Sequence, residues 1–352
     1  MARDWRTEYE GLKSYISDNP EIILSTTEIS IPQNLRDEFY LRFDRIRSAF
    51  VETHYSELPV DLDALCTHYL QVEKEVRKLL GIESISMPMD LYSILHTPKD
   101  GLTRVIYNRL FDLLQGKTKI DAFERQCAED LKTSSADLFR LGYEWWAGLV
   151  LIKLLDPDQA FAVDLDPEYK PILAELKEIS FGRQAHHPTI RIPEFVLHSR
   201  KLGKYVAVKM AITREVESYT GGIKPAVRPK KRTGDTSFAL DSRVMLLSFM
   251  SVPEKIPIVA DIYEQTLTSP DWMLECITQE EFRDSGALDE VKQRVDTMKP
   301  TLGMCLLVLD QGAEAPLQAI AENIRPVSVG FDQSKLQPVI ASLGIGGEPA
   351  PS

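Results

Sequence analysis

The spacing of apolar residues changes part-way along the chain, and this change constrains the fold more than any other feature. In the first half, hydrophobic side chains recur every three or four positions, as on an α-helix with one buried face. The clearest stripe comprises Leu35, Phe39, Phe43, Ile46 and Phe50. We therefore predict a helical bundle, with helices over about residues 35–50, 62–79, 102–113, 120–131 and 136–155.

The helical pattern breaks at the prolines and aspartates between Asp156 and Pro167, and shorter runs with a β-type period follow. Predicted helices at about 167–179, 237–251, 280–298, 316–324 and 334–343 alternate with predicted strands at about 189–199, 205–217, 256–263, 304–309 and 326–331. The first two strands form a hairpin in this prediction. Such alternation is typical of a mixed-sheet α/β domain. We expect a helical domain at 1–157, an α/β domain at 158–343 and a flexible tail at 344–352.

Composition indicates a globular protein. The 352 residues are 43% hydrophobic and 27% charged, which supplies enough apolar material for two domains with separate cores. The longest apolar stretch, from Trp145 to Leu155, is interrupted by Lys153 and falls far short of the ~20 residues of a membrane helix. The chain starts with charged residues instead of an apolar signal core, so we expect a cytoplasmic protein with no membrane partner.

Cysteine and histidine spacing does not indicate a metal centre. The four cysteines lie far apart, without a Cys-x-x-Cys pair, and three of them fall in apolar patterns. No two of the six histidines have the i, i+4 spacing of a helical zinc site. We expect buried thiols and no zinc.

Charge is distributed unevenly along the chain. The net charge is −12, but residues 183–232 contain six lysines, six arginines and three glutamates, a net charge of +9 that leaves −21 elsewhere. Such asymmetry indicates a surface that binds an anion such as DNA or RNA, although solvated basic loops without a partner are also common. The residues expected to contact nucleic acid are Lys201, Lys204, Arg228, Lys230, Lys231 and Arg232.

One passage has the residue types that phosphodiester chemistry needs. Glu194 follows a proline in one predicted strand, and Lys209 lies within an apolar run of the next. A carboxylate and a lysine that meet at one end of a hairpin can hold a divalent cation and a phosphate together. The cation takes oxygen ligands, and the lysine stabilises charge or positions the attacking water.

In order and spacing, residues 167–310 resemble the core of the PD-(D/E)xK superfamily, the restriction-endonuclease-like fold. Glu194 matches the aspartate of the Pro-Asp motif, and Lys209 matches the motif lysine. Glu175 or Glu178 matches the acid of the leading helix. The resemblance implies a nuclease-like protein that binds nucleic acid and, if its site is active, hydrolyses it with Mg²⁺. The implied catalytic residues are Glu194, Lys209 and Glu175.

The match departs from the family at one decisive position. Ala207, thirteen positions after Glu194, stands where the family has its second metal-binding acid, and a methyl group cannot ligate a cation. Either another acid completes the site or catalysis is lost. Asp261, an acid flanked by apolar residues in a predicted strand, is the best replacement, so Glu194 and Asp261 are the expected metal ligands. We predict one cluster with Ala207 facing its cavity. Its members are Glu194, Lys209 and either Glu175 or Asp261.

Two other interpretations remain open. In the first, the same fold is a non-catalytic scaffold, and the helical half binds a protein partner. In the second, the α/β fold is unrelated, Glu194 is an exposed strand-start residue and Lys209 extends its amine from a hairpin end. No phosphate-binding glycine loop, serine-hydrolase elbow or zincin motif is present to suggest another enzyme class.

Overall fold

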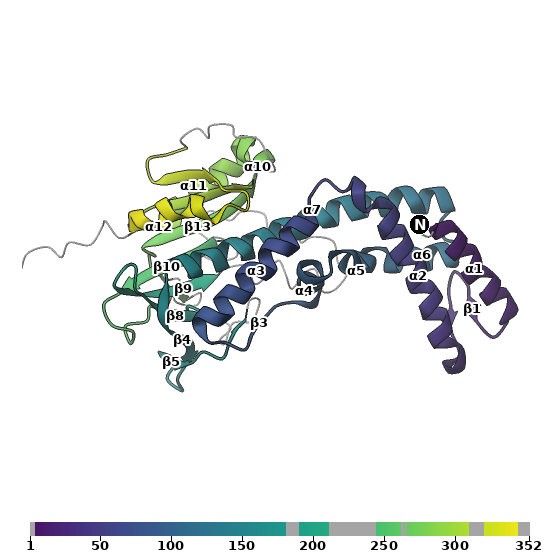
Figure 1. Cartoon of the computed structure of the whole chain (residues 1–352), viewed down its shortest axis with the longest axis horizontal. Helices are drawn as coiled ribbons and strands as arrows, with labels where there is room; N and C mark the ends of the chain where they lie inside the picture. The colour runs from purple at the N-terminus through teal and green to yellow at the C-terminus, as the bar shows by residue number, and fades with distance from the viewer. Residues whose placement is uncertain are drawn as a thin grey trace, which may run out of the picture. The chain divides into compact units, whose positions relative to one another are not determined.

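The computed structural model (Figure 1) describes residues 4–180, 190–210, 244–261, 264, 266–309 and 320–343. The chain divides into two compact units that interleave along the sequence. The first unit comprises Met1–Cys66 and Asp90–Leu141, and the second comprises Thr67–Met89 and Gly142–Ser352. The helices α3 (Leu62–Leu80) and α7 (Ile120–Leu154) contribute residues to both units.

The first unit is helical around an aromatic core. Besides parts of α3 and α7, its elements are α1 (Trp5–Asp18), β1 (Ile23–Leu24), β2 (Ile29–Ser30), η1 (Gln33–Leu35), α2 (Arg36–His54), η2 (Tyr55–Glu57), α4 (Met89–His96), α5 (Pro98–Leu102), η3 (Thr103–Ile106) and α6 (Tyr107–Leu114). The stripe predicted for α2 is confirmed from Phe39 to Phe50, because its apolar residues are buried. The Trp5 ring packs against Phe50 and Phe123, with centroids 5.2 and 5.5 Å apart.

Helix α1 forms where none is predicted. Asp4 caps α1 by accepting a hydrogen bond from the Arg6 N–H at 3.1 Å. Trp5, Tyr9 and Leu12 supply the buried face of that helix. Its apolar stripe is short, and for this reason the period does not stand out in the sequence.

The break predicted between residues 131 and 136 is wrong, because α7 runs through it as one helix of 35 residues. Leu131 and Leu138 are both buried on α7. The Ser135 hydroxyl donates a hydrogen bond to the Lys132 carbonyl at 2.9 Å, so the polar residues in between are accommodated. Burial on either side outweighs their weak helix preference.

The second unit is built on an eight-stranded mixed sheet with the strand order β15-β14-β13-β10-β9-β8-β4-β5. Its strands are β4 (Pro157–Leu165), β5 (Pro171–Glu175), β8 (Phe195–Ser199), β9 (Lys204–Met210), β10 (Val244–Met250), β13 (Trp272–Thr278), β14 (Met304–Leu309) and β15 (Ile324–Ser328). Neighbours from β5 to β13 are antiparallel, whereas β13, β14 and β15 are parallel. The chain therefore contains a mixed α/β unit, as the alternating pattern predicts.

Smaller elements complete the second unit. They are β3 (Ser84–Ser86), β6 (Glu178–Ser180), β7 (Ile190–Arg191), β11 (Ala260–Asp261), β12 (Thr266–Leu267), α10 (Gln279–Arg283), α11 (Ser285–Met298), η4 (Gln333–Leu336) and α12 (Gln337–Leu343). β3 pairs with β6, and β11 lies between β7 and β12 in a three-stranded sheet.

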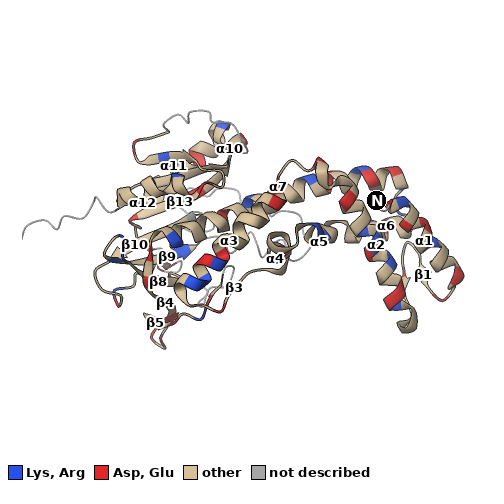
Figure 2. Cartoon of the chain, in the orientation of Figure 1, with Lys and Arg blue, Asp and Glu red and all other residues tan. Residues whose placement is uncertain are grey.

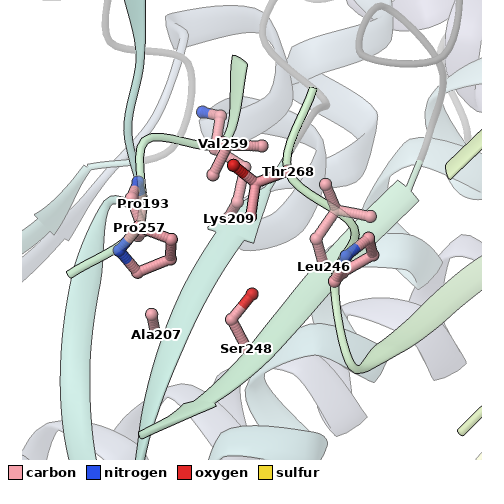
Figure 3. A pocket seen from close by; sticks show the side chains of 9 residues that line it. Pro193, Ala207, Lys209, Leu246, Ser248, Pro257, Val259 and Thr268 are labelled. Atoms are coloured by element: carbon pink, nitrogen blue, oxygen red, sulfur yellow. The ribbon is translucent and has the colours of Figure 1, made fainter. Parts of the chain in front are cut away.

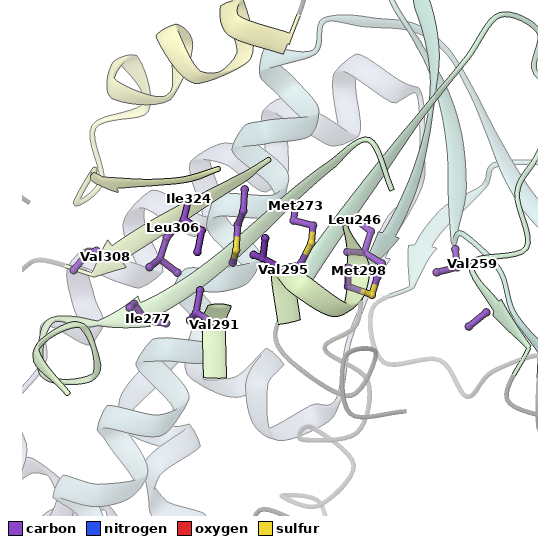
Figure 4. Packing of buried hydrophobic residues seen from close by; sticks show 12 residues of the cluster. Leu246, Val259, Met273, Ile277, Val291, Val295, Met298, Leu306, Val308 and Ile324 are labelled. Atoms are coloured by element: carbon purple, nitrogen blue, oxygen red, sulfur yellow. The ribbon is translucent and has the colours of Figure 1, made fainter. Parts of the chain in front are cut away.

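Helices pack on both faces of the large sheet. On one face, Gly148 of α7 lies so close that an added Cβ would be 3.0 Å from Met210 Cε and 3.1 Å from Met245 Cε. The next residue, Leu246, faces the opposite side, where it belongs to a core cluster with α11 (Figure 4). The residues of α11 in this cluster are Val291, Val295 and Met298.

Several predictions for the second half are wrong in element type. The helix predicted at 167–179 is absent: β5 and β6 form instead, because pairing with β4 and β3 overrides the helix preference of the Leu, Ala and Glu residues. Residues 244–250 of the helix predicted at 237–251 form strand β10. A short run of apolar residues is compatible with a buried helix as well as a buried strand, so its pattern does not distinguish the two. Residues 320–323 are not helical, and β15 starts at Ile324.

Other predictions for this half are confirmed. The β8–β9 hairpin, β14 and α12 form within the predicted ranges, and the helix predicted at 280–298 is present as α10 followed by α11. Of the described residues in the strand predicted at 256–263, Ala260 and Asp261 form β11, and β13 is a strand that the sequence does not predict. The predicted tail at 344–352 lies outside the described residues. No helix in the described part of the chain is long and apolar enough to cross a bilayer.

Candidate functional site

The β8–β9 hairpin brings Glu194 and Lys209 together. Phe195 pairs with Val208, so the preceding Glu194 lies beside Lys209, and its own N–H donates to the Val208 carbonyl at 2.9 Å. The Lys209 ammonium forms an ion pair with Glu194 Oε1. The Met210 N–H donates to Glu194 Oε2 at 2.6 Å. Both carboxylate oxygens therefore already have protein partners.

Ala207 and Lys209 line one pocket, as two residues of the same strand face should (Figure 3). Ser248 of β10 pairs directly with Ala207 across the sheet and lines the same pocket. Its hydroxyl makes no hydrogen bond to the described residues. Neither Ala207 nor Ser248 supplies the carboxylate that a two-acid metal site needs.

The opposite wall of the pocket is a cover segment, residues 257–261 and 266–270, which contributes Pro257, Val259, Thr268 and Pro270. The cover segment is tied to β7, because the Val259 N–H donates to the Arg191 carbonyl at 2.8 Å. Val259 and Ala260 are also buried in the α11 core cluster. The space between the sheet and the cover segment is too narrow to hold a water molecule. A hydrated cation does not fit.

The acids predicted on the leading helix, Glu175 and Glu178, lie on strands away from this pair. Glu175 ends the edge strand β5, three strand positions or ~14 Å from β9, and is exposed beside Lys177, 3.3 Å away. Glu178 lies in β6, paired with β3. Asp261 accepts from the Glu264 N–H at 3.2 Å and does not line the pocket. The prediction that Glu175 lies beside Glu194 and Lys209 is wrong, because it requires a helix that does not form.

No three histidine, cysteine, aspartate or glutamate side chains lie close enough to hold a metal ion within the ranges that the structure describes. The four cysteines are free, and three of them are buried. Burial raises the pKa of the Cys127 and Cys305 thiols to about 12, so both are protonated at neutral pH. Neither is the thiolate that metal binding or nucleophilic attack requires.

The predicted nucleic-acid contacts fall in two places. Arg228, Lys230, Lys231 and Arg232 lie outside the described residues. Lys201 and Lys204 lie at the turn of the β8–β9 hairpin, and Lys204 is five residues from Lys209, or ~17 Å along the strand. The structure therefore does not bring Lys201 and Lys204 to the Glu194–Lys209 pair.

A second polar cluster, which no sequence motif predicts, lies at that same turn. A β-bulge in β4 makes Asp158 an extra residue opposite His198, and Asp158 Oδ1 lies 2.7 Å from His198 Nδ1. The Tyr205 ring packs on His198 with centroids 4.8 Å apart, and its hydroxyl donates to Gln159 Oε1 at 3.2 Å. These residues are about forty positions apart in sequence, so only the strand pairing reveals the cluster.

Next to this cluster, Arg200 is paired with Asp156, 3.0 Å from Arg200 Nε to the carboxylate. The Arg200 guanidinium holds the pKa of the Asp156 carboxyl below its usual value. Asp156, close to the end of α7, has a φ of 50°, which is strained for a residue other than glycine. Its ion pair with Arg200 fixes this residue to the β8–β9 hairpin.

No protein-family model, curated protein or solved structure matches this chain. Function is therefore argued from the geometry and charge of the chain itself.

Proposed function

We propose that this protein binds nucleic acid without hydrolysing it and is a non-catalytic relative of the PD-(D/E)xK nucleases. The observation that carries the proposal is the Glu194 carboxylate, whose two oxygens are occupied by Lys209 and the Met210 N–H beside Ala207. A carboxylate, a lysine and an alanine occupy neighbouring hairpin positions that match the family motif. Each Glu194 oxygen already accepts a hydrogen bond from the protein, and Ala207 supplies no second carboxylate for a cation.

The loss of hydrolysis follows from three properties of the site. Magnesium needs several oxygen ligands and retains waters, but among the described residues no carboxylate lines the pocket, and it has no room for water. Lys209 already faces an anion, so its charge does not attract a phosphate strongly. The cover segment also occupies the face of the sheet from which a substrate would approach.

Support for nucleic-acid binding comes from charge. Residues 183–232 carry +9, whereas the rest of the chain carries −21, so a polyanion is attracted to one region and repelled by the rest. On the described elements, acidic and basic side chains are interspersed along α2 and α7 (Figure 2). These helices therefore do not form a competing basic surface.

Salt-dependent binding tests the proposal. We expect labelled DNA or RNA oligonucleotides to bind the full chain at ~50 mM salt and to dissociate steeply as salt rises, because phosphate contacts release counterions. Incubation with Mg²⁺ or Mn²⁺ should leave the oligonucleotides intact. Absence of binding at ~50 mM salt would exclude the proposed function, and cleavage abolished by Glu194→Gln would show that the site is active.

Restoring the missing acid tests the relationship to nucleases. In Ala207→Glu or Ser248→Asp, a second carboxylate would lie beside Glu194, and we expect Mn²⁺ to raise the melting temperature of at least one of these variants. Ala174→Glu, which adds a carboxylate to β5 at a distance, is the matched control. If the variants fold but Mn²⁺ does not change their melting temperature, a purely structural role of this sheet is favoured.

A second candidate function, a protein-interaction module, is favoured by one feature of the helical unit. Ile23 and Ile29 of the β1–β2 hairpin are 43% and 49% exposed, an apolar pair on a short projecting element. Light scattering on the full chain and affinity capture test this function. A strict monomer that captures no partner would count against it.

A further inference from the structure

We infer that the turn end of the β8–β9 hairpin is a binding site for an unpaired nucleotide of single-stranded nucleic acid. The inference rests on the proposed function and locates part of it. We call this site the tip surface and define it as Asp158, Gln159, His198, Lys201 and Tyr205.

The aromatic part of the tip surface is held in place from β4. The β-bulge points Asp158 at His198 Nδ1, and Gln159 accepts a hydrogen bond from the Tyr205 hydroxyl. The two rings are tilted by 54° with centroids 4.8 Å apart, and the His198 side chain remains 27% exposed. Because their polar edges are fixed, these rings lose little conformational freedom when a base stacks against them.

The charges around the turn leave a cation for a phosphate. Arg200 is neutralised by Asp156, with two hydrogen bonds between them. Lys201 is exposed and interacts electrostatically with Asp156, but it forms no salt bridge with an acid in the described part of the chain. Lys204 lies 6.0 Å from the centroid of the Phe249 ring and likewise has no acidic partner there. A ring platform beside unpaired lysines is the combination that binds single strands.

This chemistry favours an unpaired nucleotide over a duplex, because base pairing hides the faces that stack. The tip surface is also separate from the Glu194–Lys209 pair, since Tyr205 lies four residues, or ~13 Å, from Lys209 along β9. Variants at the two places should therefore have independent effects.

The test uses the full chain and three fluorescent probes: a thymidine 20-mer, a uridine 20-mer and a 20-base-pair duplex. We expect Tyr205→Leu and Lys201→Glu each to weaken binding of the single strands about tenfold, and the duplex much less. His198→Gln should weaken the single strands by a smaller factor. Lys170→Glu, on the β4–β5 turn, is the control with the same charge change.

Crosslinking provides a measurement on the unmodified protein, so the test does not depend on a folded Tyr205 variant. A 5-iodouracil probe irradiated in the complex should crosslink to the peptides containing Tyr205 or His198. Wild-type protein that binds while the tip variants bind equally well, with crosslinks elsewhere, overturns this inference alone. Wild-type protein that binds none of the probes overturns the proposed function together with it.

Discussion

Two carboxylate–cation pairs lie on the same face of the large sheet, one in each half of it. Lys209 of β9 pairs with Leu246 of β10, and Leu246 pairs with Met273 of β13, so the three side chains lie on one face of the sheet. Glu275 comes two residues after Met273 on β13 and therefore lies on that face as well. In the parallel half, Glu275 of β13 meets Arg294 of α11, with side chains 5% and 7% exposed. In the antiparallel half, the exposed fractions are 24% for Glu194 and 12% for Lys209.

The partners explain what each pair does. The planar guanidinium of Arg294 donates two hydrogen bonds to Glu275, one of them 2.9 Å long, and fixes α11 on the sheet. Glu194 instead divides its oxygens between an ammonium and a backbone N–H within one hairpin. A carboxylate beside a cation on a sheet is therefore not evidence of catalysis by itself, since the parallel half contains such a pair under a helix.

The largest expected effect comes from breaking the buried pair. Arg294→Leu should lower the free energy of unfolding by about 3–5 kcal/mol, because Glu275 is left charged and buried. Urea unfolding followed by circular dichroism measures the loss. The double variant Glu275→Leu/Arg294→Leu should recover most of it. A double variant as unstable as the single one would mean that the loss does not come from leaving the Glu275 charge buried without a partner.

The glycines of the two halves give the next test. Gly303, before β14, has a φ of +83°, and an added Cβ would lie 2.6 Å from the Asn323 carbonyl oxygen. Gly303→Ala should therefore cost roughly 2 kcal/mol or more. Gly148→Ala meets only the flexible ends of Met210 and Met245 and should change stability by less than about 1 kcal/mol. Equal effects would show that the two halves are packed with similar tolerance.

The hairpin pair should matter less than the pair under α11. Lys209→Met should lower the free energy of unfolding by about 1–2 kcal/mol, since Glu194 keeps its bond to the Met210 N–H and is partly hydrated. Glu194→Gln retains a hydrogen-bond acceptor and should cost less. Nucleic-acid affinity should stay unchanged in both folded variants. A large loss of affinity on removing Lys209 would reassign that lysine to binding.

Period and turn signals predict much of this architecture. The α2 stripe, the β8–β9 hairpin and β14 follow from the 3.6 and 2.0 residue periods. The meeting of Glu194 with Lys209, and the orientation of Ala207 with Lys209, also follow from strand geometry alone. Local signals are sufficient where the partners are neighbours in sequence.

The errors occur where distant pairing decides the structure. Residues 171–175 favour a helix locally but pair with β4, and this misassignment placed Glu175 in the wrong site. β10 and β13 are apolar on both faces, so their sequences do not distinguish strand from helix. The cluster around Asp158 depends on a bulge in a strand about forty residues from His198, which no local pattern encodes.

A third carboxylate–lysine pair extends the comparison to greater exposure. Glu75 of α3 lies 2.6 Å from Lys153 of α7, with side chains 36% and 33% exposed, and Lys153 also donates to Gln333 at 2.8 Å. The hydrogen bond from Lys153 holds the pKa of the Glu75 carboxyl below its usual value of about 4.5. A carboxyl whose pKa is lower in the folded state stabilises the fold above its unfolded pKa. That contribution is lost as the pH falls through the folded value.

Glu75→Gln should therefore destabilise the protein at pH 7 by a few tenths of a kcal/mol, up to about 1, because water screens an exposed pair. At a pH below this lowered pKa the difference from wild type should shrink, since the Glu75 carboxyl is then protonated and loses its charge. Urea unfolding of both proteins at the two pH values measures the change, with Glu168→Gln on the exposed β4–β5 turn as control. A pH-independent difference would mean that Glu75 acts by packing alone. An effect as large as that of Arg294→Leu would contradict the dependence on burial that separates the two halves of the sheet.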